Sequence, residues 1–252
     1  MLKKDANVSC GDYFEGRRLY PEARAPFDLA ECETCGFARF RQFSDWDEAQ
    51  FRDAIYNDSY HLCDAPFEIE RPTKLAAWLS GHIGARALLD FGGGEGKLAE
   101  LLCAGGHSAA SYDPYYGADA YPQKKFDIVT AFEVVEHVPD QEWLFAELRA
   151  LAKPGGLIVF STLLRPDSFL PDWWYASPRN GHASFHSSES LRRLLARAGL
   201  HLVSLSRELH GCSQDPANLQ DFATWRVPPV NGRPSYVFET QWSAMRPVSP
   251  QL

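Results

Sequence analysis

Apolar and polar positions alternate along residues 73–205 in blocks that fit strands and helices in turn. Short apolar runs predict strands at 87–91, 109–112, 126–132, 157–162 and 200–205. Apolar residues at helical spacing predict helices at 73–83, 97–103, 141–153 and 191–198. A further β-like run spans 235–242. Strands that alternate with helices predict an α/β fold with a mainly parallel sheet.

A glycine-rich turn, Gly92 to Gly96, directly follows the strand at 87–91. Open parallel sheets bind ligands beyond the carboxyl ends of their strands, and glycines let the backbone approach a ligand closely. The spacing is G-x-G-x-G, because Lys97 stands where the dinucleotide-binding pattern has its third glycine, and the phosphate-loop order is absent. The alternative is a tight turn that binds nothing.

Asp113 ends the next strand, where a carboxylate accepts hydrogen bonds from ribose hydroxyls in nucleotide-binding sheets. The alternative is a helix cap or turn residue. The glycine turn and Asp113 in register together favour a cofactor site.

Three segments, in the same order, resemble the motifs of class I S-adenosylmethionine (SAM)-dependent methyltransferases. They are LLDFGGGEG at 88–96, FDIVTAFEVVEHV at 126–138 and LAKPGGLIV at 151–159. The resemblance covers roughly residues 70–210. It implies a Rossmann-like sheet, to which a small irregular N-terminal module is joined.

The resemblance also implies roles in binding the cofactor. Residues expected around its methionine part are Asp90, Gly92, Gly94 and Gly96; Asp113 would hold the ribose, and Phe132 and Glu133 would lie beside the cofactor. The segment between Asp113 and Phe126 is too short for the usual helix and third strand, so residues 118–120 are the candidate for the adenine contact.

Two histidines are candidates for the base that an oxygen or nitrogen acceptor requires. His182 is the first choice because aromatic residues and a glycine surround it in the segment after the strand at 157–162, and His137 is the second. His137 alternatively caps its loop. Trp173, Trp174 and Tyr175 are predicted to form a wall for the substrate, with core packing as the alternative.

The first quarter of the chain contains a cysteine pattern. Cys32 and Cys35, followed by Gly36, have the C-x-x-C-G form of a zinc knuckle, and Cys10-Gly11 resembles the end of a second one in which Asn7 replaces a cysteine. A subgroup of the resembled methyltransferases carries such a module. Cys10, Cys32 and Cys35 are the predicted metal ligands, and Cys63 or His61 would complete the set. A metal-free relic is the alternative, and the context of a redox C-x-x-C is absent.

Composition narrows the class of protein. The 252 residues are 45% hydrophobic and 13% aromatic, which argues against disorder. The net charge of −8 counts against nucleic acid and anionic membranes as partners. No apolar run reaches the ~18–20 residues of a membrane span, and the start lacks a leader-like apolar stretch, so a cytoplasmic enzyme is expected.

The sequence therefore predicts three parts: a cysteine-containing module at 1–67, a SAM-binding domain at 68–210, and a segment at 211–252 that completes the sheet and covers the substrate side. The expected activity is methyl transfer from SAM to a small molecule such as a sugar or a secondary-metabolite intermediate, at oxygen or nitrogen rather than carbon. The alternatives are a non-catalytic binding protein of the same fold and, disfavoured by the glycine spacing, a nicotinamide-dependent oxidoreductase.

Overall fold

The computed structural model describes residues 2–64, 67–116, 121–167 and 173–225. The chain divides into two compact units, each built from segments distant in sequence. Unit 1 consists of residues 1–69, 136–141 and 163–191, and unit 2 of residues 70–135, 142–162 and 192–252.

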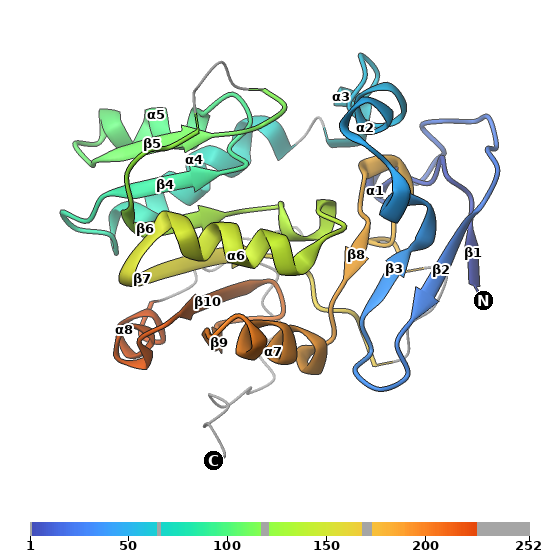
Figure 1. The fold of residues 1–252 in the computed structure, drawn as a ribbon. Helices are drawn as coiled ribbons and strands as arrows, with labels where there is room; N and C mark the ends of the chain where they lie inside the picture. The colour runs from blue at the N-terminus through green and yellow to red at the C-terminus, as the bar shows by residue number, and fades with distance from the viewer. Residues whose placement is uncertain (1, 65–66, 117–120, 168–172, 226–252) are drawn as a thin grey trace. The chain divides into compact units, whose positions relative to one another are not determined.

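Unit 2 contains a six-stranded sheet with the strand order β5-β4-β6-β7-β10-β9 (Figure 1). The pairs β5–β4, β4–β6 and β6–β7 are parallel, whereas β10 runs antiparallel to both of its neighbours. The mainly parallel α/β sheet expected from the sequence is thus confirmed. The strands are β4 Leu88–Phe91, β5 Ala109–Tyr112, β6 Phe126–Ala131, β7 Ala152–Ser161, β9 His201–Ser204 and β10 Leu209–Ser213.

The register of the parallel strands brings their carboxyl ends to one edge of the sheet. Asp90 on β4 pairs with Ser111 on β5 and with Thr130 on β6, and Thr130 pairs with Val159 on β7. The residues that directly follow these strands therefore share that edge.

Five helices belong wholly or mainly to unit 2, and α6 crosses the face of the sheet turned toward the viewer in Figure 1. They are α4 Phe67–Ser80, α5 Lys97–Ala104, α6 Gln141–Leu151, α7 Ser188–Arg197 and α8 Pro216–Phe222. Buried side chains from α4, α5, α8 and the strands form one apolar core, which includes Leu79, Leu102 and Phe222. None of the helices in the described residues is long and apolar enough to span a membrane.

The order of strands and helices in unit 2 follows the sequence pattern as far as β9, whereas several boundaries differ from it and the sequence did not predict β10 or α8. The helix predicted at 141–153 ends at Leu151, and β7 begins at Ala152 because Ala152 pairs with Phe126 ahead of a register shift. The expected boundary at residue 210 falls inside β10. The β-like run at 235–242 lies outside the described residues.

Unit 1 contains a four-stranded antiparallel sheet, β1-β2-β3-β8, in which β8 comes from the distant segment 163–191. Its strands are β1 Leu2–Lys4, β2 Phe27–Glu31, β3 Ala38–Phe40 and β8 Ser184–Phe185. Its helices are α1 Cys10–Glu15, α2 Glu48–Ala54 and α3 His61–Asp64, with short 3-10 turns at η1 Arg41–Asp45, η2 Val135–His137 and η3 Pro178–Asn180.

The core of unit 1 is largely aromatic. Phe40, Phe43 and Phe185 are fully buried, and Phe40 meets Phe43 and Phe185 edge to face at ring-centroid distances of 6.3 and 5.6 Å. Aromatic pairs of this geometry stabilise a core beyond the area they bury. The N-terminal segment, which has few aliphatic residues of its own, therefore completes its core with side chains from 173–185.

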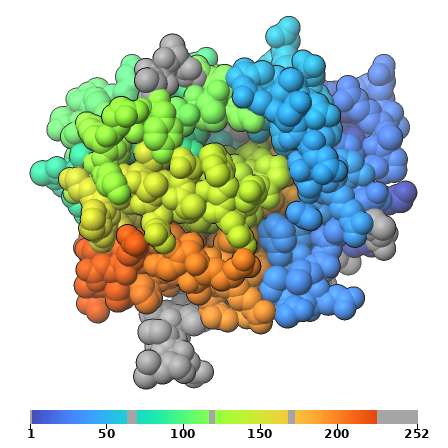
Figure 2. Space-filling model, viewed as in Figure 1, coloured from blue at the N-terminus to red at the C-terminus, as the bar shows by residue number. Residues whose placement is uncertain are grey.

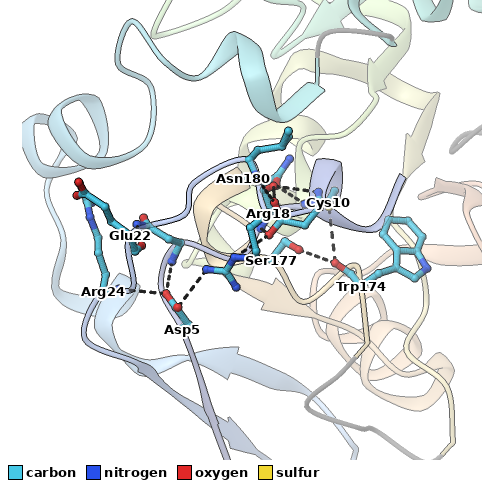
Figure 3. Close-up of polar contacts among 12 residues, drawn as sticks. Asp5, Cys10, Arg18, Glu22, Arg24, Trp174, Ser177 and Asn180 are labelled. Atoms are coloured by element: carbon cyan, nitrogen blue, oxygen red, sulfur yellow. Dashed lines mark hydrogen bonds and ion pairs between the residues drawn. The ribbon is translucent and has the colours of Figure 1, made fainter. Parts of the chain in front are cut away.

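Polar contacts also join the N-terminal segment to residues 174–180 (Figure 3). The Cys10 amide donates to Asn180 Oδ1 at 2.7 Å, and the Cys10 thiol lies 3.8 Å from the carbonyl oxygen of Trp174. Nearby, Asp5 accepts hydrogen bonds from the Arg18 side chain and the Arg24 amide. These contacts fix the start of α1 within unit 1.

Candidate functional site

Asp90 is a buried carboxyl group at the end of β4 in unit 2. It is 4% exposed, and its Oδ1 accepts a hydrogen bond from Thr130 Oγ1 at 2.8 Å. Burial raises the pKa of Asp90 to about 7; the hydrogen bond from Thr130 opposes the rise and the charge of Asp113 adds to it. Asp90 therefore changes its charge near neutral pH.

Asp113, after β5, holds the glycine turn in place. Its Oδ2 accepts from the Gly94 amide at 2.9 Å, and its Oδ1 accepts from the amides of Tyr115 and Tyr116 at 2.7 and 3.2 Å. These are the bonds of a turn residue, one of the two roles considered above. Its contact with a ribose stays a prediction, and residues 118–120, the candidate adenine contact, lie outside the described residues.

The structural reason for a glycine differs from one position of the turn to the next. A Cβ on Gly92 would lie 2.4 Å from Val134 Cγ2, and one on Gly93 would lie 2.4 Å from both Asp90 Oδ2 and Ser111 Oγ. Gly94, by contrast, has a φ of +57°, and no atom of the described residues lies within 4 Å of a Cβ position there. Gly92 and Gly93 are required by the protein's own packing, whereas Gly94 exposes backbone to open space. The sequence pattern missed the role of Gly93.

Glu133 is the only non-glycine residue with a positive φ, +55°, among those the structure describes. Its amide donates to Ser161 Oγ at 2.8 Å, and Ser161 Oγ donates to Glu133 Oε1 at 2.7 Å. A left-handed conformation costs such a residue about 1–2 kcal/mol, and strain of this kind gathers at functional sites. Ser161 was not predicted, although it is a polar residue at the carboxyl end of a buried strand.

Phe132 lies in the core of unit 2. It is 8% exposed, and its ring centroid lies 6.5 Å from that of Trp78. Its predicted place beside the cofactor stays a prediction.

In unit 1, the structure brings together the two histidines proposed as bases and adds Glu136. One ligand atom from each of Glu136, His137 and His182 lies within 4.8 Å of the others. Glu136 Oε1 lies 3.9 Å from His137 Nε2, and the Glu136 side chain is fully buried. The two imidazole rings meet edge to face at a centroid distance of 4.9 Å.

Hydrogen bonds on the other ring nitrogens orient both histidines. His182 Nδ1 lies 2.7 Å from the carbonyl oxygen of Tyr175, and because a carbonyl only accepts, Nδ1 carries the proton. In the neutral ring Nε2 then carries the lone pair. His137 Nδ1 lies 3.2 Å from the hydroxyl of Tyr56. His182 is 5% exposed, whereas the His137 side chain is 16% exposed.

The three aromatic residues predicted as a substrate wall pack on the core of unit 1. Tyr175 is 2% exposed, and its hydroxyl accepts from the Leu163 amide at 3.2 Å. Trp173 and Trp174 are partly buried against the same core. These contacts are those of the core-packing alternative, and a contact with substrate stays a prediction.

The predicted cysteine ligands do not gather. The turn at Cys32–Gly36 has the knuckle form, since the Gly36 amide donates to the Cys32 carbonyl at 2.7 Å. Hydrogen bonds from the Cys35 and Thr34 amides lower the pKa of the Cys32 thiol. Cys10, however, is buried beside Asn180 and His182.

The proposed fourth ligands lie in other surroundings. The Cys63 thiol lies 3.1 Å from the Tyr20 hydroxyl, and His61 Nδ1 lies 2.7 Å from the Asp58 carbonyl oxygen. Among the described residues, the group with metal-ligand geometry is Glu136, His137 and His182. The structure thus gives no support to a cysteine zinc site.

A pocket of about 780 Å³ lies elsewhere in unit 2, between α6 and α7, on the face shown in Figure 2. Its lining includes Glu142, Arg149 and Arg197. None of the described residues predicted to bind the cofactor lines it.

Comparison with known proteins defines the family. A family model described as a methyltransferase domain matches residues 67–205, more than half of the chain. The chain belongs to this family. The predicted enzyme class, a SAM-dependent methyltransferase, is confirmed.

Individual relatives carry more specific names. A ubiquinone biosynthesis O-methyltransferase of Azoarcus sp. is 32% identical over 165 residues, which are 51% of this chain and 71% of that protein. The one of Bordetella pertussis is 31% identical over 134 residues, which are 42% of this chain and only 55% of that protein. Human N-acetylserotonin methyltransferase in complex with SAM superimposes with a TM-score of 0.48 at 15% identity, covering 68% of this chain and 61% of that one.

Proposed function

We propose that this protein transfers the methyl group of SAM to an oxygen or nitrogen atom of a small-molecule acceptor, with SAM bound at the carboxyl edge of the sheet in unit 2. The observation that carries the proposal is the glycine turn, where Gly94 presents open backbone while its amide is held by Asp113.

The charges at this edge suit SAM better than a dinucleotide. Asp90, Asp113 and Glu133 follow or end neighbouring parallel strands. Carboxylates stabilise the ammonium and sulfonium charges of SAM and accept hydrogen bonds from ribose hydroxyls, whereas they repel a pyrophosphate. This charge pattern argues further against the nicotinamide-dependent alternative.

The chemistry places modest demands on the protein. Bound SAM supplies a methyl group on a good leaving group, so the chain mainly has to orient the donor and acceptor and keep water out. Asp113 would hold the ribose, and Asp90 and Glu133 would orient the methionine part. His182 and His137 are the candidate groups that take the acceptor's proton.

The acceptor class rests on the relatives and on charge. The curated relatives are named O-methyltransferases of ubiquinone biosynthesis, which favours oxygen as the methylated atom and a small molecule as the acceptor. The net charge of −8 also favours a small molecule over nucleic acid.

Titration calorimetry tests the donor site directly. We expect SAM and S-adenosylhomocysteine each to bind with one site per chain and NADH not to bind. Asp113→Asn should weaken the binding of both by about tenfold or more, because an amide oxygen is a weaker acceptor for ribose hydroxyls than a carboxylate. Absence of heat with both SAM and S-adenosylhomocysteine would overturn the proposal.

Turnover separates an enzyme from a binding protein of the same fold. Purified protein incubated with SAM and a panel of small phenols, alcohols and amines should form S-adenosylhomocysteine with at least one acceptor. Binding of SAM without turnover on any member of a broad panel would favour the non-catalytic alternative.

A further inference from the structure

We propose that Glu136, His137 and His182 form a binding site for one divalent transition-metal ion in unit 1. This inference deepens the proposed function, because it assigns the two candidate bases a different role, but the binding of metal stands or fails independently of methyl transfer.

Two hydrogen bonds join the two sequence segments of the site on the carboxyl side of His182. The Ala183 amide donates to the Glu136 carbonyl at 2.6 Å, and Ser184 Oγ donates to the Val138 carbonyl at 3.2 Å. On the other side, the Asn180 side chain accepts from the Cys10 amide at 2.7 Å. His182 is therefore fixed opposite Glu136 and His137 by the backbone, although 45 or more residues separate them in the chain.

The ligand types and their orientation match those of metal sites. Metal-bound imidazoles almost always donate their other N–H to a carbonyl, carboxylate or water, which fixes the tautomer. His182 does so through Nδ1 to the Tyr175 carbonyl at 2.7 Å, and the Tyr56 hydroxyl lies 3.2 Å from His137 Nδ1. Each ring is thus oriented by a contact of its Nδ1 atom. In His137, the Nε2 atom faces the Glu136 carboxylate.

Gly181 preserves this arrangement. Its φ is +82°, and a Cβ there would lie 3.2 Å from the Tyr56 hydroxyl oxygen and 3.4 Å from His137 Nδ1. The glycine next to His182 therefore leaves room for the pair that orients His137.

The fully buried carboxylate of Glu136 supplies the charge that a cation requires. Its Oε1 lies 3.9 Å from His137 Nε2, and a buried anion is stabilised most by an adjacent cation. The three ligand atoms lie within 4.8 Å of one another. A tetrahedral ion about 2.1 Å from each would hold them roughly 3.4 Å apart, so side-chain movements of about one ångström complete the site.

Two imidazoles and one carboxylate define the ligand class. Nitrogen ligands favour Zn²⁺, Co²⁺ or Fe²⁺ over Mg²⁺ and Ca²⁺, and three protein ligands leave a coordination position for water or substrate. A water molecule or hydroxyl group bound there would lose its proton to bulk water at lower pH than it does in solution.

The first test is metal binding to the full chain after treatment with a chelator and dialysis. We expect one equivalent of Zn²⁺ or Co²⁺ by calorimetry and visible Co²⁺ absorption typical of a nitrogen- and oxygen-ligated ion, with much weaker binding of Mg²⁺. Binding of no Zn²⁺ or Co²⁺ by protein that still binds SAM would overturn the metal site and leave the proposed function standing.

Variants locate the ion. His182→Ala and Glu136→Gln should each lower Co²⁺ affinity about 100-fold or more because each removes a ligand, and Tyr56→Phe should lower it about tenfold by releasing His137. His201→Ala, which changes an exposed histidine of unit 2, should bind Co²⁺ as the parent does. Circular dichroism and calorimetric unfolding check that unit 1 still folds in each variant.

A double variant, Cys32→Ser with Cys35→Ser, distinguishes the two candidate metal positions. It should keep the equivalent of Co²⁺ and its absorption spectrum. Loss of the bound ion in this double variant, with His182→Ala unchanged, would place the metal at the cysteine turn and overturn the proposal.

Discussion

The two units position the groups of their candidate sites in different ways. In unit 2 the proposed site consists of backbone turns and carboxylates at the ends of parallel strands, and a mainly aliphatic core supports it. In unit 1 the candidate chemistry lies in imidazole, carboxylate and phenol side chains on irregular segments, around an aromatic core. A regular sheet positions backbone atoms through its ladder, whereas irregular segments need specific side-chain packing to hold a cluster.

The largest expected effect on stability comes from core substitutions that destabilise one unit at a time. Phe43→Ala in unit 1 and Phe145→Ala in unit 2 each remove a fully buried ring and should cost about 3–5 kcal/mol of unfolding free energy. If the units unfold separately, Phe43→Ala lowers one calorimetric transition and spares SAM binding, while Phe145→Ala weakens SAM binding. A single transition lowered equally by both variants would show that the units unfold as one.

Much of unit 2 was predictable from the sequence because its candidate site residues lie next to strands and turns that the local sequence pattern reveals. The strand at 87–91, the glycine turn and Asp113 are separated by single structural elements, so periodicity and turn chemistry place them. Even there, Ser161 and the strained backbone of Glu133 escaped prediction, since a hydrogen bond between two strand ends has no local signature.

Unit 1 was not predictable in the same way. The sequence showed an N-terminal segment short of aliphatic residues but not that residues 173–185 complete its core. The cysteine spacing suggested a metal site with Cys10, which instead lies beside Asn180. The Glu136, His137 and His182 group depends on pairing across 45 or more residues, and no spacing rule within a single sequence reports such a contact.

Substitutions in the glycine turn of unit 2 should have a smaller effect on stability and SAM binding. Gly92→Ala should cost about 1–3 kcal/mol of stability and weaken SAM binding, because the new methyl group meets Val134 at 2.4 Å. Gly94→Ala and Gly106→Ala share positive φ and open surroundings, at +57° and +86°, so each should cost only about 1 kcal/mol. Weaker SAM binding by Gly94→Ala but not by Gly106→Ala would place the ligand at Gly94; equal binding by both would argue against it.

Buried titratable groups in unit 2 give opposing pH dependences. The raised pKa of Asp90, about 7, means that the folded state holds a proton that the unfolded state has lost, so its contribution to stability falls as pH rises from about 4 to 7. Burial lowers the pKa of His210 to about 4, so its contribution falls as pH drops from about 6.5 to 4.

Variants separate the two contributions. In Asp90→Asn, stability should rise with pH between about 4 and 6.5, and in His210→Gln it should fall with pH between about 4 and 7. Urea denaturation at several pH values measures both slopes. Identical pH profiles for the parent and Asp90→Asn would show that the pKa of Asp90 is the same in the folded and unfolded states and would contradict its raised value.

The smallest effect compares matching ion pairs in the two units. Glu48–Arg52 on α2 and Glu70–Lys74 on α4 are exposed pairs four residues apart, with N–O distances of 2.7 and 2.8 Å. Glu48→Gln and Glu70→Gln should each cost only about 0.3–0.5 kcal/mol, and less at high salt. Because the two changes are chemically alike, differential scanning calorimetry of both reports which unit governs each transition. Glu48→Gln should lower the melting temperature of the transition that Phe43→Ala lowers, and Glu70→Gln that of the other; the same shift from both changes would instead mean that the units share one cooperative transition.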